Sequence, residues 1–324
     1  MLETSRTGSH SHVPLTCRKI TNIPSLTIPP FNSSLITPPP PLHSTRHQPK
    51  SQSPFSLSLS LFQPPQQTTL VFGNFVNLWQ KKMWQTPYRK NDMEAGARPL
   101  YPTMMESPEL RWAFIRKIYS ILTLQLLLTI AVAAVVVAVR PIAVFFATTA
   151  AGLALYIVLI IMPFIVLCPL YYYHQRYPLN YFLLGLFTVG LAFVVGLTCA
   201  FTGGKVILES VILTTAVVVS LTLYTFWAAS RGHDFNFLGP FLFGAVFVLI
   251  LFALIQMLFP LGKISVMIYG CLASIIFSGY IIYDTDNLIK RYSYDEYIWA
   301  TIALYIDIIN LFLSVLTCFR VADA

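Results

Sequence analysis

Seven long apolar runs follow one another from about Trp112 to near the end of the chain. Each run is long enough to cross a bilayer core of about 30 Å as a helix. Only 10% of all residues are charged, against about 25% in a soluble domain. A chain in lipid must satisfy its backbone hydrogen bonds within itself, as helices and closed barrels do. The runs lack the alternation of apolar and polar residues that is typical of barrel strands, so we expect helices. The predicted spans are residues 114–139, 142–168, 180–202, 206–229, 237–259, 264–288 and 298–319.

Gly, Pro and charged residues separate the runs, which predicts short connections. Examples are Arg140-Pro141 after the first run and Gly203-Gly204 after the third. Short connections place successive helices antiparallel to each other. We therefore predict an all-α membrane protein, with seven transmembrane helices in residues 114–324.

The N-terminal part of the chain has a different composition. Residues 1–83 are rich in Ser and Pro and contain few acids, so we expect a disordered basic extension that cannot bury a core. Residues 84–113 are then a cytosolic N-terminal segment. The net charge of +8 belongs to residues 1–90, and residues 91–324 are balanced. No basic patch with interleaved aromatic residues is evident, so no nucleic-acid partner is expected.

The distribution of Lys and Arg predicts the orientation in the membrane. Counting from Arg98, the connections on the N-terminal side carry eight of these residues and the other side carries four. This bias places the N-terminus in the cytosol and, with seven spans, the C-terminus on the opposite side. A re-entrant last segment would instead return the C-terminus to the cytosol.

Two aspartates interrupt the last two apolar runs. A carboxylate in hydrocarbon costs roughly 2.5–3.5 kcal/mol on insertion scales, so it usually persists because it pairs, binds a cation or moves a proton. Asp307 lies about 12 Å beyond Trp299 at 1.5 Å per residue, and Asp284 lies about 9 Å before Lys290. Asp307 is thus near the membrane midplane. It belongs to a stripe of small and polar residues, namely Ala303, Asp307, Asn310, Ser314 and Cys318.

Whether the two carboxylates meet depends on the connection between their helices. They share one depth only if residues 291–297 are not a helical turn that crosses the membrane. A close pair in a low dielectric would share a proton and titrate as a unit. It would bind Ca²⁺ only weakly, because that cation prefers more oxygen ligands than two carboxylates can offer.

The other acids in or near the spans have simpler interpretations. Asp286 lies four residues before Lys290, which predicts a solvated ion pair on the helix surface. Glu209 is expected to reach water or Lys205. Both remain secondary candidates, together with Asn310.

Cysteine and histidine suggest no cofactor. Five cysteines occur without a CxxC motif, so we expect small apolar residues rather than a disulfide framework. No His/Cys ligand cluster, phosphate-binding loop or nucleophile motif is evident, and Ca²⁺ enters only as a transported ion.

The sequence contains five recognisable segments, 106–111 (ESPELR), 114–117 (FIRK), 213–216 (LTTA), 283–285 (YDT) and 304–312 (LYIDIINLF). Together they resemble the Bax-inhibitor/Lifeguard family of multi-pass membrane proteins, and most of all its plant-type Lifeguard branch. The resemblance covers about residues 84–324. The last of these segments is the most specific.

This resemblance implies a seven-helix fold with the last helix at its centre. It also implies a pH-sensitive Ca²⁺ leak across an intracellular membrane, with Asp284 and Asp307 as paired aspartates, and a role in restraining stress-induced cell death. Some bacterial relatives pair the aspartates with a basic residue at the end of the second span. Here His174 or Arg176 would fill that gating role.

Three functions can be weighed against these features. The first is a Ca²⁺ leak channel or Ca²⁺/H⁺ exchanger. The alternative is a non-conducting scaffold that regulates other channels or cell-death proteins. An intramembrane aspartyl protease would need Gly-x-Gly-Asp, whereas Leu304-Tyr305-Ile306 precedes Asp307, so we expect no enzyme. Expected partners are the lipid bilayer and other membrane proteins of the cell-death and calcium machinery. The resemblance favours the endoplasmic reticulum, with the Golgi, vacuole and plasma membrane as alternatives.

Overall fold

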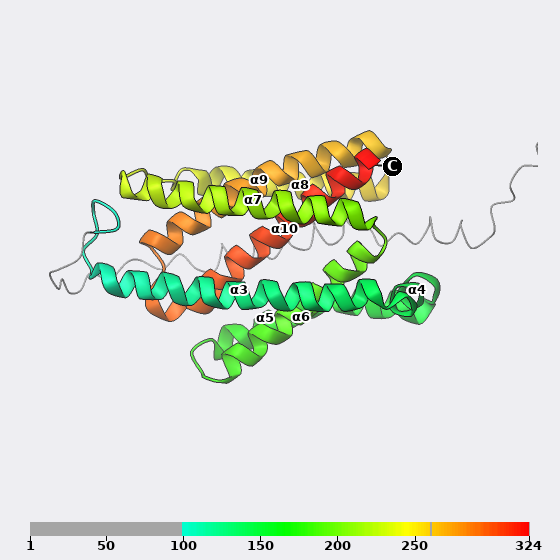
Figure 1. The fold of residues 1–324 in the computed structure, drawn as a ribbon, viewed down its shortest axis with the longest axis horizontal. Helices are drawn as coiled ribbons and strands as arrows, with labels where there is room; N and C mark the ends of the chain where they lie inside the picture. Colours follow the sequence, from blue (N-terminus) through cyan, green and yellow to red (C-terminus); the bar gives the residue numbers. More distant parts are fainter. Residues whose placement is uncertain (1–98, 260, 324) are drawn as a thin grey trace, which may run out of the picture. The chain divides into compact units, whose positions relative to one another are not determined.

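A computed structural model describes residues 99–259 and 261–323 of the chain, and all regular elements within them are helical (Figure 1). In chain order these are α3 (Pro108–Ala138), α4 (Arg140–Thr148), α5 (Ala150–Tyr173), α6 (Leu179–Ala200), α7 (Gly204–Ser230), α8 (Leu238–Leu258), α9 (Lys263–Lys290), the 3₁₀ turn η1 (Tyr294–Glu296) and α10 (Tyr297–Asp323).

Seven of these helices are long and apolar enough to cross a membrane, which confirms the predicted fold class. They are α3 and α5 to α10. Most helix ends lie within a few residues of the predicted ones, because Gly, Pro and charged residues stop the helices where the sequence indicated. The predicted extension, residues 1–83, lies outside the described residues.

The second predicted span, residues 142–168, is wrong as a single helix. The chain forms the short helix α4 first and then leaves helical geometry at Thr149 (φ −110°, ψ 142°). The Thr149 hydroxyl accepts a hydrogen bond of 2.9 Å from the Gly152 amide and so caps α5. Gly152 packs so tightly that an added Cβ would overlap the Phe145 carbonyl oxygen. The crossing helix α5 therefore begins later and ends later than predicted.

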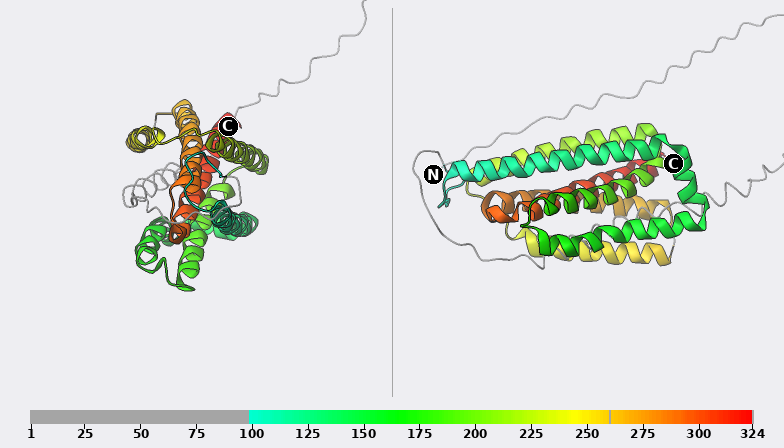
Figure 2. Two further views of the ribbon diagram at one scale, coloured as in Figure 1. Left: turned by 90° about the vertical axis from the view of Figure 1, so that its left-hand side faces the viewer. Right: turned by 90° about the horizontal axis from the view of Figure 1, so that it is seen from below.

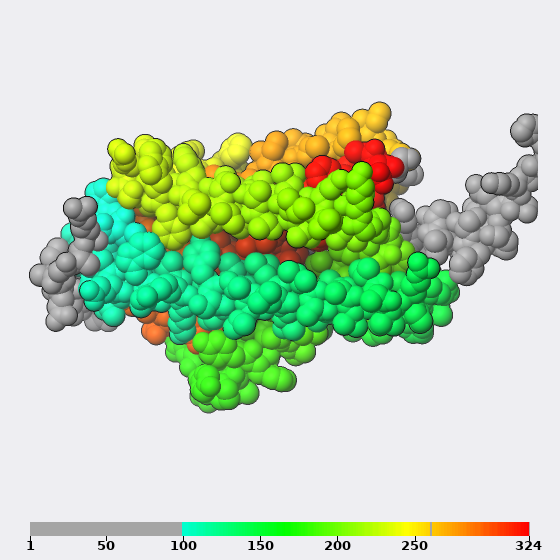
Figure 3. All heavy atoms as spheres, viewed as in Figure 1, coloured from blue at the N-terminus to red at the C-terminus, as the bar shows by residue number. Residues whose placement is uncertain are grey.

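Helix α10 lies at the centre of the bundle. Every residue from Ile298 to Thr317 is buried. The end-on view in Figure 2 shows α10 (orange to red) surrounded by the other helices. In Figure 3 its middle is visible as a strip between α3 and α7, and its C-terminal end (red) reaches the surface. This arrangement confirms the central last helix that the family resemblance implied. Because α10 is an unbroken helix of 27 residues, about 40 Å long, it favours a complete crossing over a re-entrant segment.

Polar contacts and small residues hold the helices together, as expected where lipid gives little hydrophobic drive for association. The Gln125 amide donates to the Thr188 hydroxyl at 2.8 Å and joins α3 to α6. The hydroxyls of Thr129 and Tyr305 lie 2.8 Å apart and join α3 to α10. Gly196 on α6 lets α3 approach so closely that an added Cβ would lie 2.9 Å from the Cα of Ala133.

Two glycines on α6 provide a matched test of this packing. We expect Gly196→Ala to destabilise the protein by about 1–3 kcal/mol, because its methyl group overpacks the interface with α3. An added Cβ at Gly185 meets nothing within 4 Å, so Gly185→Ala should be neutral or stabilise by up to about 1 kcal/mol through helix propensity. Thermal denaturation in detergent micelles measures both variants. Equal melting temperatures would contradict the close packing of α3 and α6.

Candidate functional site

Three aspartates within the last two spans are buried inside the bundle. Asp284 is 2% exposed, Asp286 1% and Asp307 0%. Asp307 lies on the central helix α10, and Asn310, one turn further on, is buried as well. Burial of three acids in so apolar a bundle makes the α9–α10 pair the candidate site.

Contacts near the far ends of the two helices show which face of α10 carries Asp307. An added Cβ at Gly270 on α9 would lie 2.9 Å from the Cys318 sulfur and 3.1 Å from the Ser314 carbonyl oxygen. Residues 307, 310, 314 and 318 share one face of a helix by their three- and four-residue spacing. Asp307 therefore faces α9, whereas Tyr305 points to Thr129 on α3.

The same contact sets the relative depth of the two carboxylates. Measured from Gly270 and its neighbours on α10, Asp284 lies about 21 Å along α9 and Asp307 about 14 Å along α10. Their Cα atoms thus differ in depth by roughly 7 Å. Because side chains lean toward the N-terminus of their own helix, the carboxylates of these antiparallel helices lean toward each other.

Two tyrosines lie within electrostatic range of both carboxylates. Burial of the Tyr292 hydroxyl raises the pKa of this phenol well above its ordinary value, and the negative charges of Asp284, Glu296 and Asp307 add to the effect. Tyr280 on α9 also lies within electrostatic range of both Asp307 and Asp284. A phenol can donate a hydrogen bond to a carboxylate, so these tyrosines can help to hold a charged or a protonated pair.

The connection between α9 and α10 contains a helical turn that leads directly into α10. Helix α9 ends at Lys290, η1 begins at Tyr294, and α10 begins at Tyr297. A capping box closes η1, in which the Ser293 amide donates to a Glu296 carboxylate oxygen at 2.9 Å. The last candidate span therefore runs from Tyr294 to Asp323. This is the case in which the sequence predicts different depths for the two aspartates, and it agrees with the difference in depth of roughly 7 Å between their Cα atoms.

A buried arginine that we did not predict as a site residue holds this connection. The Arg111 guanidinium on α3 donates to the Tyr292 carbonyl oxygen at 2.6 Å and to a Glu106 carboxylate oxygen at 2.6 Å. It also lies 5.4 Å from the centre of the Tyr294 ring. The Tyr294 hydroxyl donates to Glu106 at 3.0 Å. The only sequence signal was the segment 106–111 at the start of the first span.

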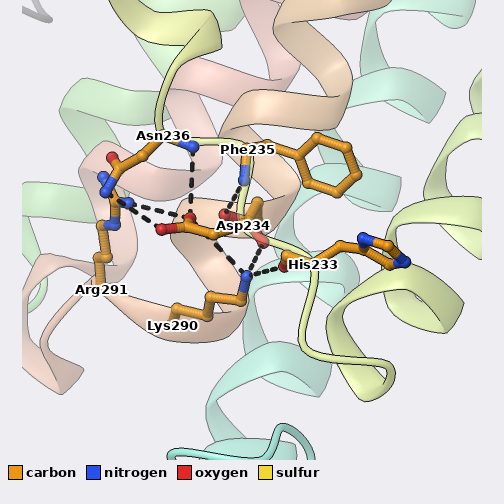
Figure 4. A network of polar contacts seen from close by, with 7 residues as sticks. His233, Asp234, Phe235, Asn236, Lys290 and Arg291 are labelled. Atoms are coloured by element: carbon orange, nitrogen blue, oxygen red, sulfur yellow. Dashed lines mark hydrogen bonds and ion pairs between the residues drawn. The ribbon is translucent and has the colours of Figure 1, made fainter.

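The prediction for Asp286 is half right. Lys290 does pair with it, at 2.6 Å, but the pair is not on the surface, since Lys290 is only 14% exposed. The α7–α8 connection folds over this end of α9 (Figure 4), where the Lys290 amine donates to the His233 carbonyl oxygen at 2.5 Å. The Phe235 amide donates to Asp286 at 3.4 Å. This long-range cover, which helical spacing does not show, removes the pair from water.

Asp234 extends this network to the end of α9. Its carboxylate lies 3.3 Å from the Arg291 guanidinium and 3.9 Å from the Lys290 amine (Figure 4). The two cationic side chains thereby hold the exposed Asp234 loop against the α9–α10 connection.

The remaining predicted residues lie outside these contacts. Glu209 and Lys205 form an exposed pair at 3.8 Å, as predicted. The His174 ring lies 6.4 Å from the Trp299 ring near the start of α10. Arg176 is exposed, and it forms no ion pair with an aspartate within residues 99–259 and 261–323. Basic groups that reach the α9–α10 connection from α3 are Arg111, bonded to Tyr292, and Lys117, whose amine lies 3.3 Å from the centre of the Tyr297 ring.

The donor set around the aspartates is small. Across the part of the chain that the structure describes, no group of three or more His, Cys, Asp or Glu side chains could hold a metal ion. Two aspartates alone suit a weakly held, passing cation better than a resident one.

These features define a multi-pass helical membrane protein built around a buried last helix that carries an acid at its middle. Residues 111–323 match the family model described as "Inhibitor of apoptosis-promoting Bax1". The chain belongs to the Bax inhibitor/Lifeguard family.

Its similarity to plant members is high. It is 75% identical to Protein LIFEGUARD 4 of Arabidopsis thaliana over 244 residues, which is 74% of this chain and 99% of that protein. It is 74% identical to Protein LIFEGUARD 2 of the same plant over 242 residues, 75% of this chain and all of that protein. The Golgi anti-apoptotic protein of Vaccinia virus is 35% identical over 218 residues, 67% of this chain and 89% of that protein.

Removal of Arg111 tests the connection between α3 and the α9–α10 stretch. We expect Arg111→Ala to destabilise the protein by about 3–5 kcal/mol, because Glu106 loses its buried partner. Arg116 is exposed one turn further along α3, so Arg116→Ala should change stability by no more than about 0.5 kcal/mol. Thermal denaturation in detergent compares the two. A similar small loss in both variants would show that Arg111 does not hold the connection.

The two lysine–acid pairs provide a second comparison. Lys290→Met leaves the buried Asp286 without its cation and should destabilise by about 3 kcal/mol or more. Lys205→Met breaks the exposed pair with Glu209 and should cost less than about 1 kcal/mol. Adding Asp286→Asn to Lys290→Met should restore part of the loss, as a double-mutant cycle measures. Equal effects of the two lysine substitutions would refute the burial of the first pair.

Proposed function

We propose that this protein is a pH-sensitive Ca²⁺ leak channel or Ca²⁺/H⁺ exchanger of an intracellular membrane, the endoplasmic reticulum, and that it limits stress-induced cell death. The observation that carries the proposal is the burial of Asp307 at the middle of the central helix, with Asp284 on the adjacent helix leaning toward it. An acid at such depth is costly to insert, and cations and protons are what it can serve there.

The chemistry of the pair supports a pH-dependent cation pathway. Like charges in a low dielectric disfavour the doubly ionised state. A proton or a Ca²⁺ ion relieves that repulsion, so the two compete for the same oxygens. Tyr280 and Tyr292, which lie within electrostatic range of both carboxylates, can donate hydrogen bonds to whichever oxygen is charged.

The relatives support the cell-death part of the proposal. The matching family model describes an inhibitor of an apoptosis-promoting protein. The viral relative is named an anti-apoptotic protein of the Golgi. A leak that lowers stored Ca²⁺ connects such a role to the buried acids.

Calcium flux into liposomes that contain the purified protein tests the proposal. Asp307→Asn keeps the size of the side chain but removes its charge, so we expect flux several-fold below that of the wild type. Protonation neutralises the carboxylates, so wild-type flux should fall as the pH is lowered, and this dependence should flatten in the variant. Glu209→Gln, which removes an exposed acid, should leave both properties unchanged.

Unchanged flux with an unchanged pH profile in Asp307→Asn would overturn the proposal. The scaffold function is separated by the double variant Asp284→Asn with Asp307→Asn. If that variant loses all flux and still protects cells from stress-induced death, the protein acts on other membrane proteins by contact.

A further inference from the structure

Two cysteines from distant parts of the sequence meet at the end of the α9–α10 pair that lies away from the aspartates. The sulfur atoms of Cys271 on α9 and Cys318 on α10 lie 3.3 Å apart. Cys318 also lies 3.8 Å from the Met267 carbonyl oxygen, one turn earlier on α9. Both thiols are reduced in the structure.

The close approach of the two helices is built into the sequence at Gly270. An added Cβ there would lie 2.9 Å from the Cys318 sulfur, so any larger residue would push Cys318 away from α9. A disulfide needs its two sulfurs at about 2.05 Å, and therefore an approach of only about 1 Å from their present positions.

One of the two thiols lies on the outer surface of the helix bundle. Cys271 is exposed and Cys318 is half-buried, whereas Cys199 is buried inside the bundle. Small apolar packing, the ordinary role of cysteine in a helix bundle, does not need one of the thiols on the outer surface. Nor does it account for two thiols in contact across a helix interface.

We propose that Cys271 and Cys318 form a reversible disulfide that ties α9 to α10. The oxidant is a small-molecule or protein disulfide. One cysteine thiolate attacks it to give a mixed disulfide and release one thiol, and the second cysteine thiolate then displaces the other thiol. The two cysteine sulfurs lose two electrons and two protons in total, and the oxidant is reduced to two thiols.

The location suits such a switch. The pair lies toward the side with fewer Lys and Arg residues, which the charge distribution predicts to face away from the cytosol, where disulfides persist more readily. Because α9 carries Asp284 and α10 carries Asp307, a covalent bond between the helices fixes the register on which the approach of the carboxylates depends. The disulfide itself does not depend on the proposed Ca²⁺ flux.

Counting thiols in the purified full-length protein tests this proposal. The protein is reduced, exposed to oxidised glutathione, denatured and labelled with a maleimide polymer that shifts its mobility on a gel. The chain has five cysteines, so five labels are expected before oxidation and three after it. Mass spectrometry should find the peptides of Cys271 and Cys318 joined, and reductant should restore both thiols.

Matched variants identify the pair. Cys271→Ser and Cys318→Ser should each abolish the joined peptides, whereas Cys168→Ser should retain them. Gly270→Ala keeps both cysteines in the chain but pushes Cys318 away from α9, so it should slow the oxidation several-fold. Oxidation should raise the melting temperature of the wild type but not that of Cys271→Ser. Five labels after oxidation, a glutathione adduct on one thiol alone, or a disulfide between two copies of the chain would each overturn the proposal.

Discussion

The complete burial of α10 is the constraint on which the rest of the structure depends. A helix enclosed on every side from Ile298 to Thr317 must find partners for its polar groups within the protein, because neither water nor lipid can supply them. Tyr305 meets Thr129 on α3, and the Ser314 hydroxyl bonds back to the Asn310 carbonyl oxygen. Asp307 is the one acid among these enclosed residues. An acid in such a position is typical of a group that binds a cation or a proton.

The position of α10 also depends on contacts made by the short connection between α9 and α10. Arg111 holds its backbone at Tyr292, and Lys290 holds the end of α9 to the α7–α8 connection. Both cations are largely withdrawn from water, which strengthens their bonds to acids and carbonyl groups and makes their loss costly. The relative depth of Asp284 and Asp307 thus depends on contacts made outside the bundle core.

The sequence pattern predicted correctly those features that depend on a single segment of the chain. The length of each apolar run predicted seven spans, because the bilayer sets the length of a helix that crosses it. The same reasoning failed at Thr149, where a side-chain cap and a close backbone approach at Gly152 end one helix and start another within an apolar run. It also failed for the surroundings of Asp286, because the loop that buries this acid is some 50 residues away in the chain.

The sequence by itself determined the class of fold, the number of spans and the presence of acids in the last two, since these follow from composition and spacing along one segment. Only the tertiary structure decided which groups surround those acids. Arg111 and Tyr292 are 181 residues apart, and Cys271 and Cys318 are 47 apart. Such contacts arise when helices pack against a common centre, and no periodicity within a single helix encodes them.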